Sequence, residues 1–314
     1  MDTPRVFRFL EERQLQGERT ALVTVCAVEG SSMRNPGTHM AVSEDGSFAG
    51  SLSGGCIENA VVAEAQSAIE DGMQRIVRFG AGSPYLDIRL PCGGGLDLHF
   101  QPLVDRCTVQ SSCAAIAARQ PFSIEIGSKG VRFDGGWQPA SFDRETRSGI
   151  FGHWPSARLL IVGHGAGVES LALLARSMDC AVNVLTPDER IERALRGQSF
   201  EVARLSRTTE THLLASDPWT AFVFLFHDHD WEIHLMQAAL KLPHFYIGAM
   251  GGRQAHAARC QALVATGVLR HTVNSIHAPI GLFHSSRDPQ TLALSALGEI
   301  MLEYQRAEFR SVND

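Results

Sequence analysis

The sequence predicts an α/β protein in which an N-terminal α+β domain precedes a domain built on a doubly wound parallel sheet. In the first part of the chain, short strand-like runs bounded by turn residues mix with a few helical segments, as in antiparallel sheets. In the second part, apolar strands alternate with helices, which is typical of parallel strands joined by helical crossovers. The change falls near "GIFGHWPSAR", so we expect domains at 1–152 and 153–314.

The N-terminal elements follow from local patterns. A helix, a buried strand, a hairpin and a second helix are expected at 3–14, 20–30, 37–55 and 56–72. The hairpin is predicted because Asp45-Gly46 is a turn pair. The second helix is predicted because Ile57, Val61 and Ala65 fall on one face and Gly72 ends it. Two more strands, a helix that stops before Pro121 and another hairpin complete the domain.

The C-terminal domain begins with a strand, a glycine turn, a helix and a second strand over 158–190. Further strand–helix pairs follow, and the last helix is expected at 288–306. Asp288 should cap that helix, and Pro289 should occupy its first position. In such sheets ligands bind beyond the carboxyl ends of the strands, so residues that follow strands are candidates for a site.

Composition and charge exclude several classes of protein. The 314 residues are 44% apolar and 20% charged, which is ordinary for a globular chain. The net charge is −6 and no Lys/Arg-rich block occurs, so nucleic-acid binding is not expected. No apolar run approaches the about 18 residues of a membrane span, and the N-terminus lacks a signal-peptide core. We therefore expect a cytoplasmic protein without membrane contact.

The chain has seven cysteines and no close CxxC pair. The odd count in a cytoplasmic protein indicates free thiols instead of a disulfide framework. Two of the cysteines lie beside glycines. "SLSGGCIENAV" places Cys56 after Gly54 and Gly55, and "LPCGGGLDL" places Cys92 before Gly93 and Gly94.

Both segments suit contact with a phosphate or a metal. A glycine turn at the start of a helix exposes amide groups and carries partial positive charge, which favours an anion and a reactive thiolate. The alternative for Cys56 is a buried cysteine after a tight turn, and for Cys92 a bulge before the next strand. A zinc site would need about four ligands, and His39 or His99 are candidates to join the two cysteines.

The segment "GHGAGVES", 163–170, is a weakened dinucleotide-binding fingerprint. Gly163 and Gly165 occupy its first two glycine positions, after a strand and before a helix. Val168 stands at the third glycine position. Thr186 stands where an acidic residue usually holds the ribose, with Asp188 two residues later. The pattern predicts a Rossmann-like domain and leaves an NAD(P)-dependent oxidoreductase as an alternative function.

Three other segments place polar side chains after strands of the second domain. "FHDHD" supplies His227 and Asp228 for proton transfer or metal binding, so a metallohydrolase that also uses His229 is a third possibility. The simpler interpretation is a polar loop in which Asp230 caps the next helix. Arg253 follows two glycines and suits an anion, and His277 lies in the rigid segment "HAPIGL".

Taken together, these segments resemble the XdhC/CoxI family, the accessory factors of xanthine dehydrogenase and carbon monoxide dehydrogenase maturation. The family's N-terminal pattern is matched by Gly30, Ser31, Ser32, Arg34, Pro36, Gly37, Gly54, Gly55, Cys56, Ile57 and Glu58. Its Cys-Gly-Gly element, glycine turn, histidine–acid segment, Tyr-Ile-Gly strand and "HAPIGL" element follow in order over nearly the whole chain. The chain departs from the family at Ser53, usually a glycine, and from the dinucleotide fingerprint at Val168 and Thr186.

The resemblance implies a maturation factor that binds molybdenum cofactor (molybdopterin) and supports its sulfuration with a cysteine desulfurase. Such a factor delivers the cofactor to an apo xanthine dehydrogenase-type molybdoenzyme, as a chaperone more than a catalyst and as a homodimer. Our hypothesis is that Cys56 and Cys92 bind the metal in one cleft between the domains, while Arg34 pairs with the phosphate. The expected cofactor-binding residues are Cys56, Cys92, Gly54, Gly55, Gly93, Gly94, Arg34, Glu58, Gly163, Gly165, His227, Asp228, Arg253 and His277.

Overall fold

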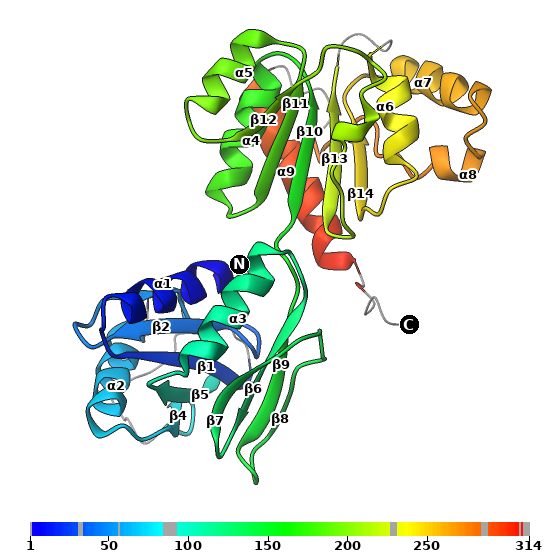
Figure 1. Cartoon of the computed structure of the whole chain (residues 1–314). Coiled ribbons are helices and arrows are strands. Elements are labelled where there is room, and N and C mark those ends of the chain that lie inside the picture. The colour runs from blue at the N-terminus through cyan, green and yellow to red at the C-terminus, as the bar shows by residue number, and fades with distance from the viewer. Residues whose placement is uncertain are drawn as a thin grey trace. The chain divides into compact units, whose positions relative to one another are not determined.

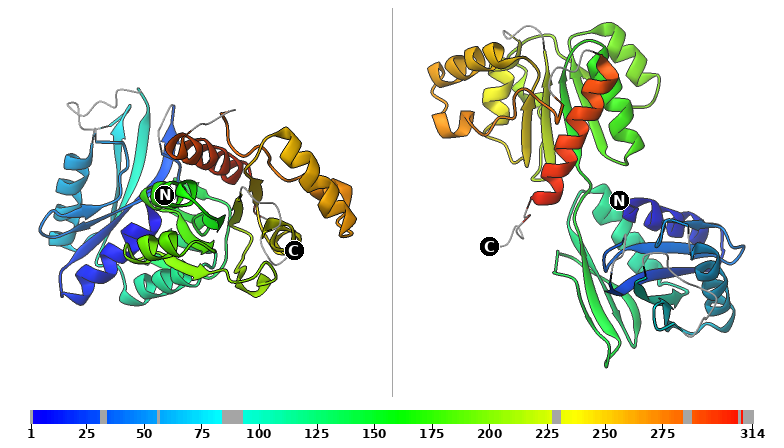
Figure 2. Two further views of the ribbon diagram at one scale, coloured as in Figure 1. Left: turned by 90° about the horizontal axis from the view of Figure 1, so that it is seen from above. Right: turned by 180° about the vertical axis from the view of Figure 1, so that it is seen from behind.

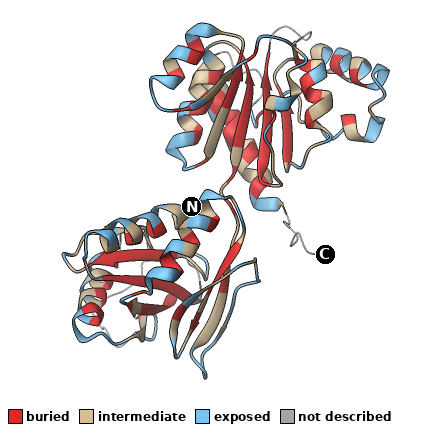
Figure 3. Cartoon of the chain, in the orientation of Figure 1, coloured by how far each residue is buried: buried red, intermediate tan, exposed pale blue. Residues whose placement is uncertain are grey.

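The structure is a computed structural model that describes residues 2–30, 34–55, 57–83, 93–226, 231–283, 288–307 and 309. The chain divides into two compact units, Met1–Pro155 and Ser156–Val312 (Figure 1). Each unit has its own sheets and its own buried interior, as colouring by burial shows (Figure 3). The expected succession of antiparallel sheets followed by a parallel sheet with helices is confirmed.

The N-terminal unit contains a five-stranded antiparallel sheet in the order β3-β2-β1-β5-β4. Its strands are β1 (Thr20–Glu29), β2 (His39–Ser43), β3 (Phe48–Ala49), β4 (Arg75–Gly80) and β5 (Gly95–Pro102). β2 and β3 form the expected hairpin, and Gly46 adopts the positive φ of +84° that its turn requires.

Both faces of this sheet are covered, because successive residues of β1 point to opposite sides. On one side Val23 and Val25 pack with Val61 and Ala65 of α2 (Glu58–Asp71). The other side carries Leu22 and Cys26, which pack with α1 (Thr3–Leu15), α3 (Arg106–Ala117) and a second sheet. This double burial explains why β1 reads as a nearly continuous apolar run.

The second sheet of the unit has four antiparallel strands in the order β7-β6-β9-β8. They are β6 (Phe122–Gly127), β7 (Gly130–Asp134), β8 (Ser141–Asp143) and β9 (Ser148–His153). Phe122, Ile124 and Phe151 of this sheet join the core beneath α1. The hairpin predicted between 122 and 137 is the β6–β7 pair.

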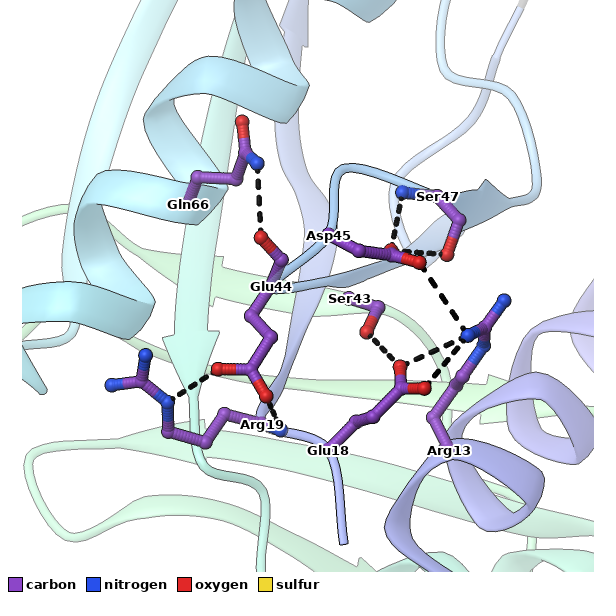
Figure 4. A network of polar contacts seen from close by, with 8 residues as sticks. All are labelled: Arg13, Glu18, Arg19, Ser43, Glu44, Asp45, Ser47 and Gln66. Carbon is purple, nitrogen blue, oxygen red and sulfur yellow. Dashed lines mark hydrogen bonds and ion pairs between the residues drawn. The ribbon is translucent and has the colours of Figure 1, made fainter. Parts of the chain in front are cut away.

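A polar network fastens the β2–β3 hairpin to both helices that flank it (Figure 4). Arg13 at the end of α1 contacts Glu18 and Asp45, and Glu18 accepts a hydrogen bond from the Ser43 hydroxyl at 2.6 Å. Glu44 pairs with Arg19, and its backbone carbonyl accepts from Gln66 of α2. The hairpin is thus held at its turn as well as along its strands.

The C-terminal unit has a five-stranded parallel sheet in the order β12-β11-β10-β13-β14. Its strands are β10 (Arg158–Gly163), β11 (Ala181–Thr186), β12 (Glu201–Arg204), β13 (Thr220–Leu225) and β14 (Tyr246–Ala249). The chain moves outward from β10 to β12 and then returns to β13 on the other side of β10. The switch point, where ligands bind in such sheets, therefore lies between β10 and β13.

Helices cover both faces of the parallel sheet. Leu160 and Val162 of β10 face a core built with α6 (Glu232–Ala239), α7 (Arg253–Ala265) and α8 (Arg270–Val273). On the other face, α4 (Ala166–Ser177) lies beside α9 (Pro289–Arg306), as both views show (Figures 1 and 2). The remaining elements are α5 (Glu189–Arg196) and the 3₁₀ turn η1 (Thr211–Leu213).

Two further observations concern single helices. Asp288 caps α9 as expected, accepting a hydrogen bond from the Thr291 N–H at 2.8 Å, with Pro289 in the first turn. Within the described part of the chain, no helix combines the length and the apolar character needed to cross a lipid bilayer.

Candidate functional site

Three loops that carry the glycine motifs leave the first sheet at the same edge. The end of β1 at Glu29 pairs with Gly95 at the start of β5, and the start of β2 pairs with Thr24. Because antiparallel neighbours alternate in direction, residues 30–38, 50–57 and 81–94 all connect strands at this edge. Cys56 and Cys92 belong to these loops but lie outside the described residues.

One carboxylate, that of Glu58, organises the loop that leads to Cys56. All of its hydrogen-bond donors come from 51–57, the segment just before its helix. Oε1 accepts from the Ser51 hydroxyl at 2.8 Å and from the backbone N–H groups of Leu52 at 3.2 Å and Ser53 at 3.0 Å. Oε2 accepts from the Ser53 hydroxyl at 2.6 Å and from the N–H groups of Gly55 at 2.9 Å and Ile57 at 3.2 Å.

These contacts keep Glu58 ionised. Burial raises the pKa of its carboxyl, but hydrogen bonds from Ser53 and Ser51 outweigh that effect and lower the pKa to about 2. The side chain is only 6% exposed, so its charge is satisfied by the loop and not by water. Glu58 therefore holds the glycine turn in place, which is a positioning role.

The turn itself depends on its glycines and on Ser53. Gly54 and Gly55 have φ values of +79° and +114°, which other residues rarely adopt. A side chain added at Gly55 would meet no atom within 4 Å, so the backbone there faces open space. Ser53, where the family usually has glycine, donates to Glu58 and accepts from the Ile57 N–H at 3.1 Å, so the departure adds contacts to the turn.

The helix after this turn begins later than the sequence predicted. We expected it to start at Cys56, but α2 begins at Glu58 with Ile57 as its N-cap residue. The reason is that the Ile57 N–H and the loop N–H groups before it bond to the Glu58 carboxylate, which keeps the preceding backbone outside the helix.

The segments on either side of the first sheet's edge touch at glycines. A Cβ on Gly30 would lie 3.4 Å from the Gly94 Cα, so the end of β1 and the start of β5 approach closely. Gly93 has a φ of +70° and open space around it, and the Gly94 carbonyl accepts from the Ala81 N–H at 2.9 Å. Arg34 lies in the loop after β1 and contacts Asp2 at 3.6 Å.

The histidines considered as zinc ligands have other partners. His39 Nδ1 lies 2.8 Å from the Thr24 hydroxyl, and its Nε2 lies 3.0 Å from Nε2 of His153. His99 Nε2 lies 3.2 Å from the Gln74 amide oxygen. Among the described residues, no group of three or more His, Cys, Asp or Glu side chains is placed to hold a metal ion.

The His39–His153 pair was not predicted from the sequence. Only one of the two facing nitrogens carries a proton, since two N–H groups would repel each other. Burial and the neighbouring imidazole lower the pKa of His39 well below its usual value, and burial lowers that of His153 to about 4. No local signal links positions 39 and 153, which become neighbours only when two sheets pack together.

In the C-terminal unit, the glycine turn lies at the switch point of the sheet. Gly163 ends β10 opposite Leu225, and a Cβ there would lie 2.4 Å from the Leu225 carbonyl oxygen. Gly165 is the N-cap residue of α4, with a φ of +83° and no atom within 4 Å of an added Cβ. Gly163 thus allows strand packing, whereas Gly165 leaves the helix start open.

The positions that depart from the dinucleotide fingerprint are used structurally. Val168 is fully buried, and the Thr186 hydroxyl accepts from the Asp188 N–H at 3.1 Å. The Asp188 carboxylate caps α5 by accepting from the N–H groups of Arg190 and Ile191. His227 and Asp228, as well as His229 and Asp230, follow β13 but lie outside the described residues.

Arg253 and His277 lie near the end of β14. Arg253 is the exposed first residue of α7. His277 forms a parallel bridge with Gly248 of β14, and its Nδ1 lies 3.4 Å from a Glu299 oxygen on α9. The hydrogen bond from Glu299 raises the pKa of His277.

Glu299 was missed by the sequence analysis. Its Oε2 accepts from the Tyr246 hydroxyl at 2.5 Å and from the Gly281 N–H at 2.8 Å, so it holds the "HAPIGL" segment against β14. Glu299 and Glu58 thus play the same part, each carboxylate fixing one glycine-containing motif. The Tyr-Ile-Gly and "HAPIGL" motifs marked two partners of Glu299, but nothing in the sequence pointed to the helix that carries it.

Comparison with known proteins gives this arrangement a family. The XdhC and CoxI family matches residues 14–80, and the XdhC Rossmann domain matches 159–300. The Escherichia coli (strain K12) molybdenum cofactor insertion chaperone PaoD is 32% identical over 306 residues, which cover 95% of this chain and 88% of PaoD. The chain belongs to the XdhC and CoxI family.

More distant family likenesses also span the chain. A probable xanthine dehydrogenase component of Bacillus subtilis (strain 168) is 22% identical, with 92% of this chain and 94% of that protein covered. The crystal structure of a xanthine dehydrogenase from Bacillus halodurans superposes with a TM-score of 0.78 at 19% identity, covering 99% of this chain and 97% of that one. The latter likeness shows a shared fold over both units.

Proposed function

We propose that this protein is a molybdenum cofactor insertion chaperone that delivers the cofactor to a xanthine dehydrogenase-type molybdoenzyme. The observation that carries the proposal is the likeness to PaoD along 95% of the chain. The cofactor is the cargo of such a protein, so the chain needs to bind and release it without transforming the client's substrate. A chaperone, and not an NAD(P)-dependent oxidoreductase, also agrees with the structural use of Val168, Thr186 and Asp188.

The first sheet's edge offers groups suited to that cargo. Molybdenum cofactor combines a pterin, a dithiolene that holds the metal, and a phosphate. The open backbone at Gly55 and Gly93 allows close approach of a flat ring or a phosphate. Thiolates of Cys56 and Cys92, which flank these glycines in sequence, are soft ligands that suit molybdenum. Arg34 in a neighbouring loop is a candidate for the phosphate.

We further propose that the parallel-sheet unit contributes to binding through Gly165 and Arg253. Gly165 exposes the N-terminal amides of α4 at the switch point, where anions bind well. His227 and Asp228 follow β13 at the same switch point, and His277 stands beside β14. Sulfuration of the bound cofactor with a cysteine desulfurase, and a homodimeric state, are parts of the same proposal.

The decisive experiment measures the cargo directly. The full-length chain is produced in cells with abundant cofactor, and molybdenum by mass spectrometry and pterin by fluorescence are determined per protomer. We expect both for the wild type, and loss of both for Cys56→Ala and Cys92→Ala. Cys107→Ala, on the exposed side of α3, is the matched control and should retain the cargo.

Delivery is tested separately. Loaded wild-type protein should restore activity to an apo xanthine dehydrogenase-type enzyme, and the cysteine variants should not. Wild-type protein that holds neither pterin nor molybdenum would overturn the proposal. Saturable NAD(P) binding by calorimetry that Gly165→Val abolishes would favour the oxidoreductase instead.

A further inference from the structure

A thiol and an imidazole face each other on α7, away from both glycine motifs. Cys260 follows His256 by one helical turn, so their side chains share a face of the helix. The Cys260 Sγ lies 3.5 Å from Nε2 of His256 and 3.8 Å from its Nδ1. Both residues are partly exposed, so a solvent-borne reagent has access to them.

The surroundings decide which imidazole nitrogen carries the proton. Arg259 Nη1 lies 3.5 Å from Nδ1 of His256, and a guanidinium only donates hydrogen bonds. Nδ1 is therefore the acceptor, and in the neutral ring the proton sits on Nε2, which faces the sulfur. Burial and the Arg259 charge lower the pKa of His256, which keeps the ring neutral at pH 7.

Arg259 is itself held firmly. Its Nε donates to Glu232 at 2.7 Å, and its Nη2 donates to the Met250 carbonyl at 2.7 Å. Arg259 and Glu232 have no side-chain exposure. The Nε2–H of His256 is thus aimed at Cys260 by a rigid support, and it can stabilise the sulfur as its nucleophilic anion.

The thiol also lines a cavity with a definite charge. The cavity, of about 540 Å³, lies between α7 and α8. Its polar lining comes from Gln261, Arg270 and Asn274, and Val264 and Val273 supply apolar surface. Arg270 is its one charged lining residue among those described, and it is positive. The space therefore suits a small anionic molecule with some apolar surface.

Other described cysteines differ from Cys260. Burial raises the pKa of Cys26 and Cys113 to about 12 and that of Cys180 to about 11, so these remain thiols at neutral pH. Cys107 is exposed on α3. It has no imidazole recorded beside it among the described residues, and it offers an internal reference for an exposed thiol.

From this geometry we propose that Cys260 is a site of reversible S-thiolation by the disulfide of a small anionic thiol. The Cys260 thiolate attacks one sulfur of that disulfide, forming a new S–S bond while the old one breaks. The second half leaves as a thiolate that takes a proton from water, and the Cys260 proton goes to solvent. The cysteine is oxidised and the departing half reduced, and excess small thiol reverses the step. This inference goes beyond cofactor delivery and does not rest on it.

The test uses the full-length protein with glutathione disulfide as the anionic probe. Site-resolved mass spectrometry follows mixed-disulfide formation at pH 7.5. We expect Cys260 to react about tenfold faster than Cys107, since its thiolate is hydrogen-bonded. His256→Phe should slow Cys260 to about the rate of Cys107 without affecting the latter, and His256→Gln, which keeps a donor, should restore part of the rate.

Charge selection is tested by a second pair of arms. Arg270→Gln should slow the reaction of Cys260 with glutathione disulfide several-fold but leave its reaction with cystamine, a cationic disulfide, unchanged or faster. Equal rates at Cys260 and Cys107 in the wild type would overturn the proposal. So would a rate at Cys260 that ignores His256 substitutions in variants whose melting temperature is unchanged. Equal slowing of both disulfides by Arg270→Gln would overturn the preference for an anion.

Discussion

Ser53 is joined to Glu58 twice: its hydroxyl donates to Oε2 at 2.6 Å and its backbone N–H donates to Oε1 at 3.0 Å. The two residues thereby close the glycine turn that precedes α2. Four other donors of the same loop reach this carboxylate, so one side chain determines the conformation of the segment that contains Cys56. Loss of the charge on Glu58 should therefore affect both stability and cargo binding.

The first prediction concerns Glu58→Gln. An amide has one acceptor oxygen where the carboxylate has two, so several buried N–H and O–H groups lose their partner. We expect the free energy of unfolding to fall by about 2–3 kcal/mol, measured by urea denaturation, and cofactor retention to fall with it. Glu70→Gln on the exposed side of the same helix is the control and should change stability little. Equal stability of Glu58→Gln and wild type would contradict the role given to Glu58.

The second prediction is a loss of stability in mild acid. The folded protein keeps His39 and His153 neutral, whereas the unfolded chain takes up protons below a pH of about 6.5. The free energy of unfolding should thus fall as pH decreases from about 6.5 to about 4, by up to about 1.4 kcal/mol per pH unit for each histidine. Below a pH of about 4.5, loss of the Glu58 charge adds to the decline, since its folded pKa is lowered to about 2.

Substitution separates these contributions. His153→Gln keeps a polar partner for His39 and should roughly halve the slope of stability against pH between 6.5 and 4.5. The exposed His271→Gln is its control and should leave the slope as in the wild type. An unchanged slope in His153→Gln, measured by urea denaturation at several pH values, would show that the buried pair does not govern acid sensitivity.

The third prediction distinguishes two glycines of one turn. Gly163→Ala places a Cβ 2.4 Å from the Leu225 carbonyl oxygen, so β10 and β13 must separate. We expect a cost above about 2 kcal/mol in unfolding free energy. Gly165→Ala meets only the strain of a positive φ, about 1–2 kcal/mol, because the space around it is open. The reverse order in denaturant titrations would mean that strand packing at Gly163 is not limiting.

The fourth prediction concerns the buried pair Arg259–Glu232. Removing one partner leaves an uncompensated charge in a place without solvent, so Glu232→Gln should cost about 3–5 kcal/mol. Arg259→Met combined with Glu232→Leu should cost less than the sum of the single changes, because no buried charge remains. The exposed pair Arg132–Glu125 is the control, where each change should cost no more than about 1 kcal/mol. Additive costs in a double-mutant cycle at the buried pair would refute this account.

The sequence by itself determined the elements, their class and the family. Period and turn residues identified both hairpins of the N-terminal unit, the glycine turn after β10 and the capped terminal helix, because these depend on residues close along the chain. The motif order, from the Gly-Gly-Cys segment to "HAPIGL", was enough for the family, which the comparisons confirmed.

Tertiary structure alone decided which side chains support those motifs. Position 299 lies 22 residues from His277, and position 153 lies 114 residues from His39, so no local pattern could join them. Even Glu58, adjacent to its motif, was expected to contact the ligand, and only the folded loop shows its oxygens filled by the protein's own donors. Partners of buried charges are determined by how helices and sheets pack, because desolvation makes each charge require partners from whatever segment lies within reach.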